Sequence, residues 1–397
     1  MLIKKPSKIL LVSSVCFLRA YSGTLHLARA LRAFGHTVQI LVTATEAEAA
    51  EYATLDIPVT CLVRRKGPGF SRKWETLRHR LRIFFEILQS RQIIVTENGY
   101  LLEASIAKKI RRGHLILGQY CQELHLAEDY PDIPRIRLLS RLARVPDFVV
   151  DVEPNRARVR QQKLRLRESP YILHNTLSLH GMPPRAEAGA LETLAGVPLP
   201  LNFPILIHMG GIGREKPLER IIDAVSKCRV KVFFLAFCNG PPQSIEILRQ
   251  YADSKLEPGT FAVLGPRRRD ELLASAWEAD IGVIDYSPSV ENSYNQRFCA
   301  PTKLYEFMAL GLAILGSDND SLSQIVDGER IGSCAQGGRT HDLALSLESI
   351  VANRDEMQAM GSRAAVAFQR FHCYEKLCLP VVEQISNLFE RPTQPIL

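Results

Sequence analysis

Two segments of the chain have charged side chains that suit a phosphorylated ligand. In the first they follow glycines, and in the second they stand at the start of a predicted helix. In residues 208–225 (HMGGIGREKPLERIIDAV), Gly210 and Gly211 follow an apolar run and precede Arg214 and Lys216. Glycines let the backbone approach an anion, and the free N–H groups at a helix start add positive potential. A strand-to-helix turn that needs glycine for its geometry has the same pattern, so both interpretations stay open.

The second segment is residues 300–318 (APTKLYEFMALGLAILGSD), where Lys303 and Glu306 stand near the start of a predicted helix. A spacing of three places both side chains on one face of that helix. An ammonium group suits a phosphate, and a carboxylate accepts hydrogen bonds from neighbouring hydroxyls such as those of a ribose. The alternative is an ordinary surface ion pair. A ligand site is favoured because the segment follows an apolar run that ends at Asp285.

Apolar runs of strand length alternate with helical patterns along both halves of the chain. In the first half, strands are predicted at 8–14, 37–42, 59–63, 92–96, 115–118, 148–152 and 171–174, with helices at 23–34, 73–89 and 101–111. In the second half, strands are predicted at 204–209, 231–237, 260–264, 281–285 and 313–316, with helices at 217–227, 243–251, 269–277 and 303–310, and helical patterns from there to the end. Such alternation predicts βαβ units and parallel sheets.

The length of 397 residues suggests two to three domains. A proline-rich stretch at 181–204 is the best candidate for a linker between an N-terminal domain, 1–180, and a C-terminal domain, 205–380. Residues 381–397 are expected to form a helix or tail that crosses back to the first domain. The fold class is therefore α/β, with two Rossmann-like doubly wound domains facing each other across a cleft. Ligands of such sheets bind beyond the carboxyl ends of the strands.

The second half resembles the nucleotide-sugar domain of GT-B glycosyltransferases, in particular the retaining enzymes of family 4. The helix signature P-x-K-x-x-E-x-M-A-x-G is matched from Pro301 to Gly311, and the loop signature is matched in part by residues 210–217. The resemblance implies that Lys216 binds the donor diphosphate, that Glu306 binds the ribose and that Lys303 faces the phosphates.

The match departs from the family at two places. Gly211 stands where the family has an arginine, so Arg214 is expected to supply part of the charge for the phosphates, with Arg297 as a further candidate. Phe298 stands where the family has a carboxylate that contacts the donor sugar. That carboxylate is therefore missing, or Glu291 supplies it.

The first half resembles the family more loosely. Residues 8–41 match its opening, a strand, a loop that holds Gly23 at the acceptor side or between the domains, and a helix. Residues 118–125 stand where the family has a strand that ends in His-Glu or His-Asp. We expect Glu123 to be the catalytic base, with His125 second. The alternatives are a cap or turn contact for these side chains, and a departing phosphate that takes the proton itself.

The resemblance implies transfer of a sugar from a nucleotide-diphosphate sugar to a saccharide or lipid-linked acceptor, with retention and without a cofactor. We expect no metal, because Arg214 and Lys216 would stabilise the leaving diphosphate in its place. Residues 318–320 (Asp-Asn-Asp) are interpreted as a helix cap. Two alternatives stay open: a GT-B nucleotide-sugar epimerase and a catalytically silent GT-B scaffold that binds a membrane or partner proteins.

The formal net charge of +8 and the pI near 9.0 suit an anionic partner. Residues 64–112 hold thirteen Lys and Arg against four Asp and Glu. Within them, Trp74, Leu77, Leu81, Phe84 and Leu88 follow one helical stripe with Arg78, Arg80 and Arg82 between them. This pattern predicts docking on an anionic membrane, or a core-facing helix with a solvated basic face. No nucleic-acid-binding module is recognised.

The nine cysteines are scattered singly, which favours reduced thiols and a cytoplasmic protein, peripheral on the inner face of the membrane if the basic helix docks there. No apolar run is long enough to span a membrane. The basic and apolar N-terminus is interpreted as the first buried strand rather than a signal peptide.

Overall fold

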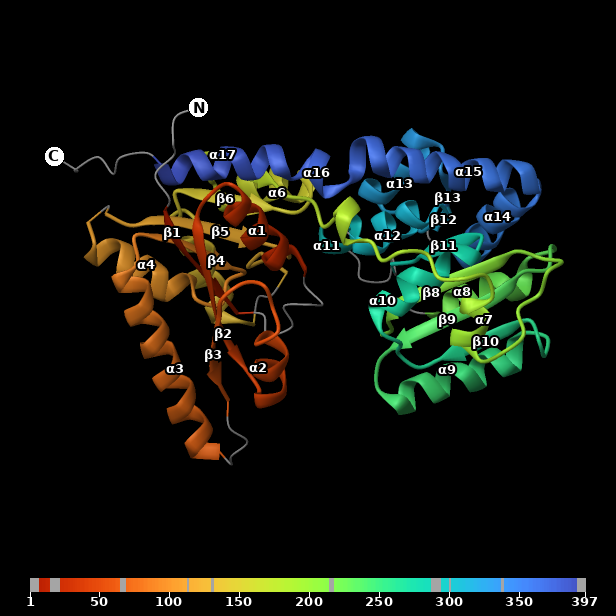
Figure 1. Ribbon diagram of the computed structural model, residues 1–397, viewed down its shortest axis with the longest axis horizontal. Helices are drawn as coiled ribbons and strands as arrows, with labels where there is room; N and C mark the ends of the chain where they lie inside the picture. The colour runs from red at the N-terminus through yellow and green to blue at the C-terminus, as the bar shows by residue number, and fades with distance from the viewer. Residues whose placement is uncertain are drawn as a thin grey trace. The chain divides into compact units, whose positions relative to one another are not determined.

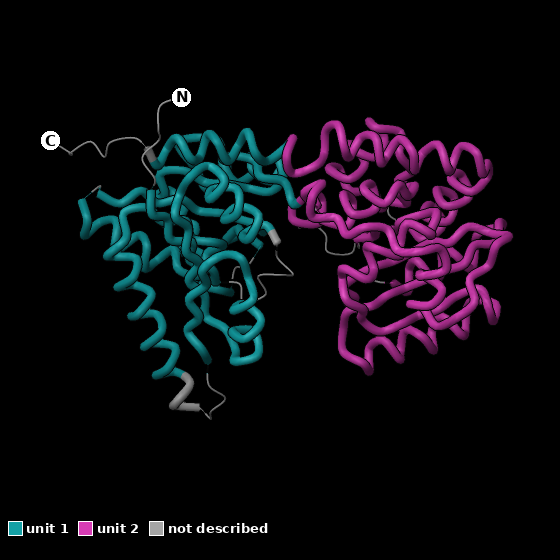
Figure 2. Tube along the Cα trace, in the orientation of Figure 1, with its two compact units in different colours: residues 1–175, 377–397 teal, residues 176–376 magenta. Residues whose placement is uncertain are grey.

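A computed structural model describes residues 7–14, 22–64, 69–112, 114–129, 132–213, 218–286, 294–299, 301–336 and 339–390. The chain divides into two compact units, which Figure 2 shows in different colours. Unit 1 consists of residues 1–175 and 377–397, and unit 2 consists of residues 176–376. Each unit has its own parallel sheet, so the expectation of two α/β domains is confirmed.

The sheet of unit 1 has seven strands in the order β3-β2-β1-β4-β5-β6-β7 (Figure 1). They are β1 (Lys8–Ser13), β2 (Thr37–Ala44), β3 (Val59–Val63), β4 (Gln92–Thr96), β5 (Ile116–Cys121), β6 (Phe148–Asp151) and β7 (Tyr171–Ile172). Residues of both parities are buried, for example Leu11 and Val12, because helices cover both faces of the sheet. The strand order reverses between β1 and β4, which is the topological switch point.

The helices of unit 1 are α1 (Ser22–Ala33), α2 (Glu46–Tyr52), α3 (Gly69–Gln89), α4 (Leu101–Ile110), α5 (Pro134–Leu142), α6 (Pro154–Leu164) and α17 (Leu379–Glu390). Helices α3 and α4 pack with β1, β4 and β5 in one hydrophobic cluster. The sequence pattern did not predict α6, because its segment is mostly polar and has no continuous apolar stripe. Its start is stabilised by Glu153, whose carboxylate accepts a hydrogen bond from the backbone N–H of Arg156 at 2.6 Å.

The buried face of helix α3 overlaps the predicted apolar stripe only at Phe84 and Leu88. Ile83 and Ile87 are fully buried, and Phe84 and Leu88 pack against the same cluster. Four other apolar residues of the helix face away from the core and are exposed, namely Trp74 at 67%, Leu77 at 46%, Leu81 at 49% and Phe85 at 54%. The helix therefore has two apolar stripes, and the core covers one of them.

The sheet of unit 2 has six parallel strands in the order β10-β9-β8-β11-β12-β13. They are β8 (Ile205–Gly211), β9 (Phe233–Asn239), β10 (Phe261–Leu264), β11 (Ile281–Ile284), β12 (Ala313–Gly316) and β13 (Gly332–Cys334). The switch point lies between β8 and β11. Strand β13 stands where the sequence predicted helices alone, and that prediction was wrong at this place. The strand has three residues, Gly-Ser-Cys, which is too short and too weakly apolar to give a strand pattern.

The helices of unit 2 are α7 (Ala190–Ala195), α8 (Leu218–Lys227), α9 (Pro242–Lys255), α10 (Arg269–Ser275), α11 (Tyr294–Arg297), α12 (Thr302–Leu310), α13 (Asp320–Glu329), α14 (Thr340–Val351) and α15 (Arg354–Ala367), and α16 (Tyr374–Leu377) follows. The stretch 181–204 is tied to unit 2 by backbone groups. The N–H of Ala186 donates to the carbonyl of Ala274 at 2.8 Å, and the N–H of Gly189 donates to Glu278 at 3.0 Å.

Helix α12, which carries Lys303 and Glu306, is fixed against the sheet by its apolar face. Leu304, Phe307 and Met308 are buried, as the spacing predicted. The Phe307 ring lies over Gly282 of β11 so closely that a Cβ at residue 282 would be 2.3 Å from its Cγ atom. The absence of a side chain at Gly282 therefore sets the distance between α12 and the sheet.

We predict that Gly282→Ala destabilises unit 2 by about 1–3 kcal/mol, because the added methyl group must displace Phe307 and α12. Urea unfolding followed by circular dichroism measures this. Gly265→Ala is the control, because a Cβ at residue 265 has no atom within 4 Å. Equal stability of the two variants would contradict this account of the packing.

Candidate functional site

The carboxyl end of β8 brings Gly210 and Lys303 together. Gly210 has a φ of 127°, which L side chains rarely adopt. A Cβ at this residue would lie 2.7 Å from Cε of Lys303 and 3.2 Å from its Nζ. The ammonium group of Lys303 therefore occupies the space beside the Gly210 backbone. Gly211 and Gly213 follow directly, so a cation and a glycine-rich backbone meet at this edge of the sheet.

Glu306 lies one helical turn beyond Lys303 and is 8% exposed. Its Oε1 atom accepts two hydrogen bonds from Arg269 of α10, one from Nε at 2.8 Å and one from Nη2 at 2.6 Å. Among the described residues, both hydrogen bonds to this carboxylate go to Oε1. The carboxylate is thus held in place through one oxygen.

A buried ion pair lies at the same edge and was not predicted from the sequence. Asp285 follows β11, and the register of β11 with β8 places it level with Gly210. Its Oδ2 is 3.5 Å from Nε of Arg220 in the first turn of α8, and both side chains are at least nine-tenths buried. Burial raises the pKa of Asp285 to about 6, against the opposing effect of Arg220. An arginine in a first helical turn usually faces water, so the sequence held no signal for this pair.

Several expected donor residues lie outside this arrangement. Arg214, Lys216 and Glu291 are outside the described residues. Arg297 forms an ion pair with Asp320 at 2.8 Å, and the ring of Phe298 stacks on Tyr294.

The expected cap at 318–320 has the right position, since α13 begins at Asp320 with Asn319 before it, but Asn319 makes no capping hydrogen bond. Its side-chain amide donates to the carbonyl of Gln296 at 2.6 Å, and its Oδ1 accepts from Ser317. The described part of the chain contains no group of three or more His, Cys, Asp or Glu arranged to hold a metal ion.

In unit 1, the expected catalytic pair follows β5. The side chain of Glu123 is 47% exposed, and its Oε2 lies 3.4 Å from Nη1 of Arg156. His125 is more buried, and burial lowers the pKa of its imidazole, with Arg160 and Arg156 acting in the same direction. These surroundings favour the neutral form of the imidazole.

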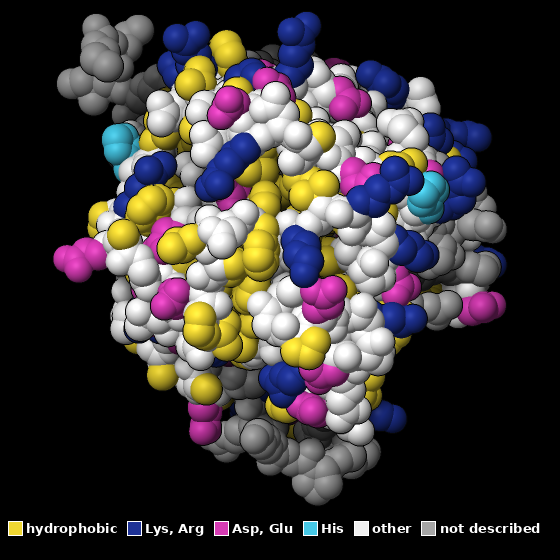
Figure 3. All heavy atoms as spheres, turned by 90° about the vertical axis from the view of Figure 1, so that its right-hand side faces the viewer, with side chains coloured by type: hydrophobic (Ala, Val, Ile, Leu, Met, Phe, Trp, Pro, Cys, Tyr) yellow, Lys and Arg dark blue, Asp and Glu magenta, His cyan; other side chains and the backbone are white. Residues whose placement is uncertain are grey.

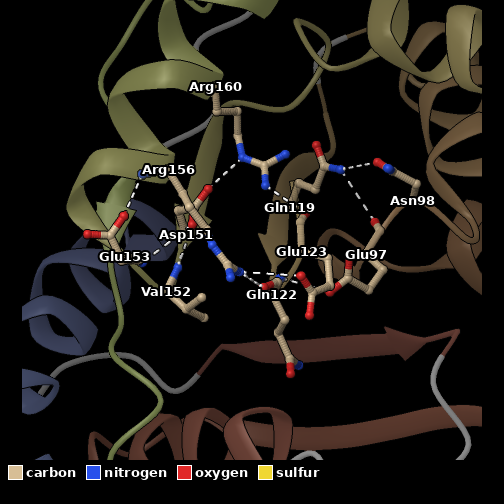
Figure 4. Close-up of polar contacts among 10 residues, drawn as sticks. All are labelled: Glu97, Asn98, Gln119, Gln122, Glu123, Asp151, Val152, Glu153, Arg156 and Arg160. Atoms are coloured by element: carbon tan, nitrogen blue, oxygen red, sulfur yellow. Dashed lines mark hydrogen bonds and ion pairs between the residues drawn. The ribbon is translucent and has the colours of Figure 1, made fainter. Parts of the chain in front are cut away.

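Two buried arginines of α6 hold the backbone at this place (Figure 4). Nη1 of Arg156 donates to the carbonyl of Gln122 at 2.8 Å, and Nη2 of Arg160 donates to the carbonyl of Glu123 at 2.8 Å. Arg160 also pairs with the buried Asp151 at 2.6 Å. The sequence did not identify these residues, because arginines four apart in a mostly polar segment predict a solvated helix face.

Two further residues shape this edge of unit 1. Glu97, directly after β4, has a φ of 55°, and its Oε1 accepts a hydrogen bond from the N–H of Gln122 at 2.7 Å. Gly23, near the start of α1, lies against the fully buried Tyr120, since a Cβ at residue 23 would be 2.3 Å from the Tyr120 hydroxyl. Gly23 and the residues after β4 and β5 therefore lie at the carboxyl edge of the sheet of unit 1.

No protein-family model and no curated protein matches the sequence. Solved structures do match. One is Alr3699/HepE of Anabaena in complex with UDP-glucose, with a TM-score of 0.75, 15% identity and coverage of 96% of this chain and 100% of that one. A glycosyltransferase of Rickettsia africae has a TM-score of 0.68 at 12% identity, covering 97% of this chain and 98% of that one. WaaG, a glycosyltransferase of lipopolysaccharide biosynthesis, has a TM-score of 0.62 at 13% identity, covering 96% and 99%.

These likenesses confirm the GT-B fold that the motifs of the sequence suggested. The assignment to family 4 stays a prediction.

We predict that the contact between Arg269 and Glu306 is worth about 1 kcal/mol, since half of the Arg269 side chain is exposed to solvent. A double-mutant cycle of Arg269→Ala and Glu306→Ala, read by urea unfolding, measures this coupling free energy. The more exposed pair of Arg249 and Glu246 is the control and should show a smaller coupling. A coupling for Arg269 and Glu306 no larger than the control would contradict the hydrogen-bond geometry.

Proposed function

We propose that the protein is a glycosyltransferase that moves a sugar from a nucleotide-diphosphate sugar to a saccharide or lipid-linked acceptor, as in polysaccharide biosynthesis. The observation that carries the proposal is the arrangement of Gly210, Lys303 and Glu306 at the switch point of unit 2. The backbone of Gly210 lies beside the ammonium group of Lys303. The buried carboxylate of Glu306 follows Lys303 by one turn of α12. The GT-B fold supports this class of reaction, and HepE was solved with UDP-glucose.

The donor binds at the carboxyl edge of unit 2. The diphosphate lies beside the backbone of Gly210 and Gly211, where Lys303 neutralises part of its charge. Glu306 accepts hydrogen bonds from the ribose hydroxyls while Arg269 holds its Oε1 atom. From the resemblance to the family, Arg214 and Lys216 add positive charge on the diphosphate. These cations stabilise the leaving group electrostatically, so the proposed reaction needs neither a metal ion nor a cofactor.

The acceptor binds at the carboxyl edge of unit 1, near Gly23. Glu123 accepts the proton of the acceptor hydroxyl, and His125 is the second candidate for this role. The half-exposed carboxylate of Glu123 can reach a substrate, while Arg156 and Arg160 hold its backbone. Retention of configuration rests on the resemblance to family 4, in whose reaction the departing diphosphate can take the proton instead of a side chain.

We predict that UDP or another nucleoside diphosphate raises the Tm of the protein and that Glu306→Ala weakens its binding at least about tenfold, through loss of the hydrogen bonds to the ribose. Lys303→Ala should weaken binding of the diphosphate and leave binding of the free nucleoside unchanged. Isothermal titration calorimetry measures both effects.

Glu187→Ala and Lys227→Ala are the matched controls, because both side chains are exposed on unit 2 away from the carboxyl edge. If no nucleoside diphosphate binds or shifts the Tm, the donor site is wrong. If a nucleotide binds but no sugar nucleotide is turned over with any acceptor, a catalytically silent scaffold is the better description.

We also propose that the exposed stripe of α3 docks on an anionic membrane surface, which would bring the enzyme to a lipid-linked acceptor. Trp74, Leu77, Leu81 and Phe85 form an apolar face beside the exposed cations Lys73, Arg78 and Arg82. Arg80 takes a different role, because it pairs with Glu103 of α4. A basic helix with exposed aromatic and aliphatic side chains suits the interface of an anionic bilayer. No described helix has the length and apolar character of a membrane-spanning segment.

The face of the molecule in Figure 3, which is the end of unit 2 at the right of Figure 1, shows basic and acidic side chains side by side. Unit 2 also has the exposed lysines Lys227 and Lys255, which serve as control positions. We predict that vesicles with phosphatidylglycerol sediment the protein and that Arg78→Glu with Arg82→Glu abolishes this binding. Lys227→Glu with Lys255→Glu, which changes the net charge equally on unit 2, should keep it. Equal loss in both double variants would show that net charge alone governs binding.

A further inference from the structure

The two residues that follow β5 are held by charged side chains from two other elements. The N–H of Gln122 donates to Oε1 of Glu97 at 2.7 Å. The carbonyls of Gln122 and Glu123 accept hydrogen bonds from Arg156 and Arg160 (Figure 4). Three backbone groups of successive residues therefore bind charged side chains. Charge-assisted hydrogen bonds are stronger than those between neutral groups. The position of the Glu123 backbone therefore depends on these contacts.

Glu97 has two energetically unfavourable features. Its backbone is in the left-handed region at a φ of 55°, which is uncommon for residues other than glycine. Its Oε2 is shielded from water and has no hydrogen-bond partner among the described residues. Backbone strain of this kind gathers at functional sites, where the surrounding structure enforces it. Glu97 also stands at the switch point of unit 1, where a ligand is expected.

We propose that Glu97 is a positioning residue for sugar transfer, whose ionised carboxylate holds the N–H of Gln122 and thereby sets the position of Glu123 for the acceptor hydroxyl. This inference rests on the proposed function, since Glu97 acts through Glu123. An ionised carboxylate accepts a hydrogen bond more strongly than a protonated one. Loss of its charge therefore loosens the segment that carries the proposed base.

The surroundings of Glu97 place its change of charge near neutral pH. Burial raises its pKa to about 7, and the carboxylates of Glu123 after β5 and Asp151 of β6 act in the same direction. Arg160 of α6 and the hydrogen bond from Gln122 oppose this rise. Tyr120 and Cys121 of β5 also face Glu97, and burial keeps both in their neutral forms at this pH. The hold on Gln122 is thus strongest above about pH 7 and weakens as the pH falls below it.

The pH profile of sugar transfer tests the proposal. The kcat of the wild type should rise between about pH 6 and pH 8, while Glu97→Gln, which stays neutral, should lose this rise and be about tenfold slower at the higher pH. Binding of the nucleoside diphosphate should be unchanged. Glu97→Asp, which can still ionise, should keep a pH-dependent rise. Glu103→Gln is the matched control, a nearly buried carboxylate that pairs with Arg80 instead and should keep the wild-type profile. An unchanged profile in Glu97→Gln would overturn the proposal.

Hydrogen exchange at the amide of Gln122 tests the same proposal without any assay of transfer. After correction for the intrinsic effect of pH, the wild type should protect this amide more at about pH 8 than at about pH 6, and Glu97→Gln should show no such difference. Equal protection of the wild type at both pH values would overturn the proposal, and this measurement is decisive even if the variant does not fold. Absence of sugar transfer by a wild type that passes this test would instead refute the proposed function.

Discussion

The parallel order of each sheet is the constraint on which the rest of the structure depends. When the strand order reverses beside the first strand, the connections leave that edge in opposite directions, and the carboxyl ends of two neighbouring strands stay open there. In unit 2 this place lies between β8 and β11, and it holds Gly210, Lys303 and Asp285. In unit 1 it lies between β1 and β4, where Glu97 stands. The strand order of each sheet thus determines where the proposed functional residues of that unit lie.

Burial of charge is the second physical theme. A buried charge is costly unless it is paired and hydrogen-bonded. Unit 1 meets this requirement fully for Arg160, which binds both Asp151 and the carbonyl of Glu123. Unit 2 meets it less completely, since Arg220 and Asp285 are 3.5 Å apart, beyond an ordinary hydrogen bond. In unit 1 the buried charges therefore fix a stretch of backbone. In unit 2 the buried charges lie at the edge where we propose that the donor binds.

The sequence predicted those parts of the fold and site that depend on apolar periodicity and on a specific motif. The strands β3, β4 and β12 were predicted at their observed bounds, and the buried face of α12 followed from its spacing. Other parts could not be predicted because no local pattern encodes them. Helix α6 has no apolar stripe, and β13 has only three, weakly apolar residues. Helix α3 has two apolar stripes, and only one of them packs against the core. The role of Arg160 and the strained backbone of Glu97 arise from contacts between segments far apart in the sequence.

The carboxyl edge of unit 2 is where we propose that a sugar nucleotide is activated. The most direct measurement is the release of free nucleoside diphosphate from a panel of UDP-, GDP-, ADP- and TDP-sugars by the purified protein, with and without EDTA. We expect one class of donor to be hydrolysed slowly in the absence of acceptor and at the same rate with the chelator. Release from none of these donors, with or without candidate acceptors, would contradict this proposal.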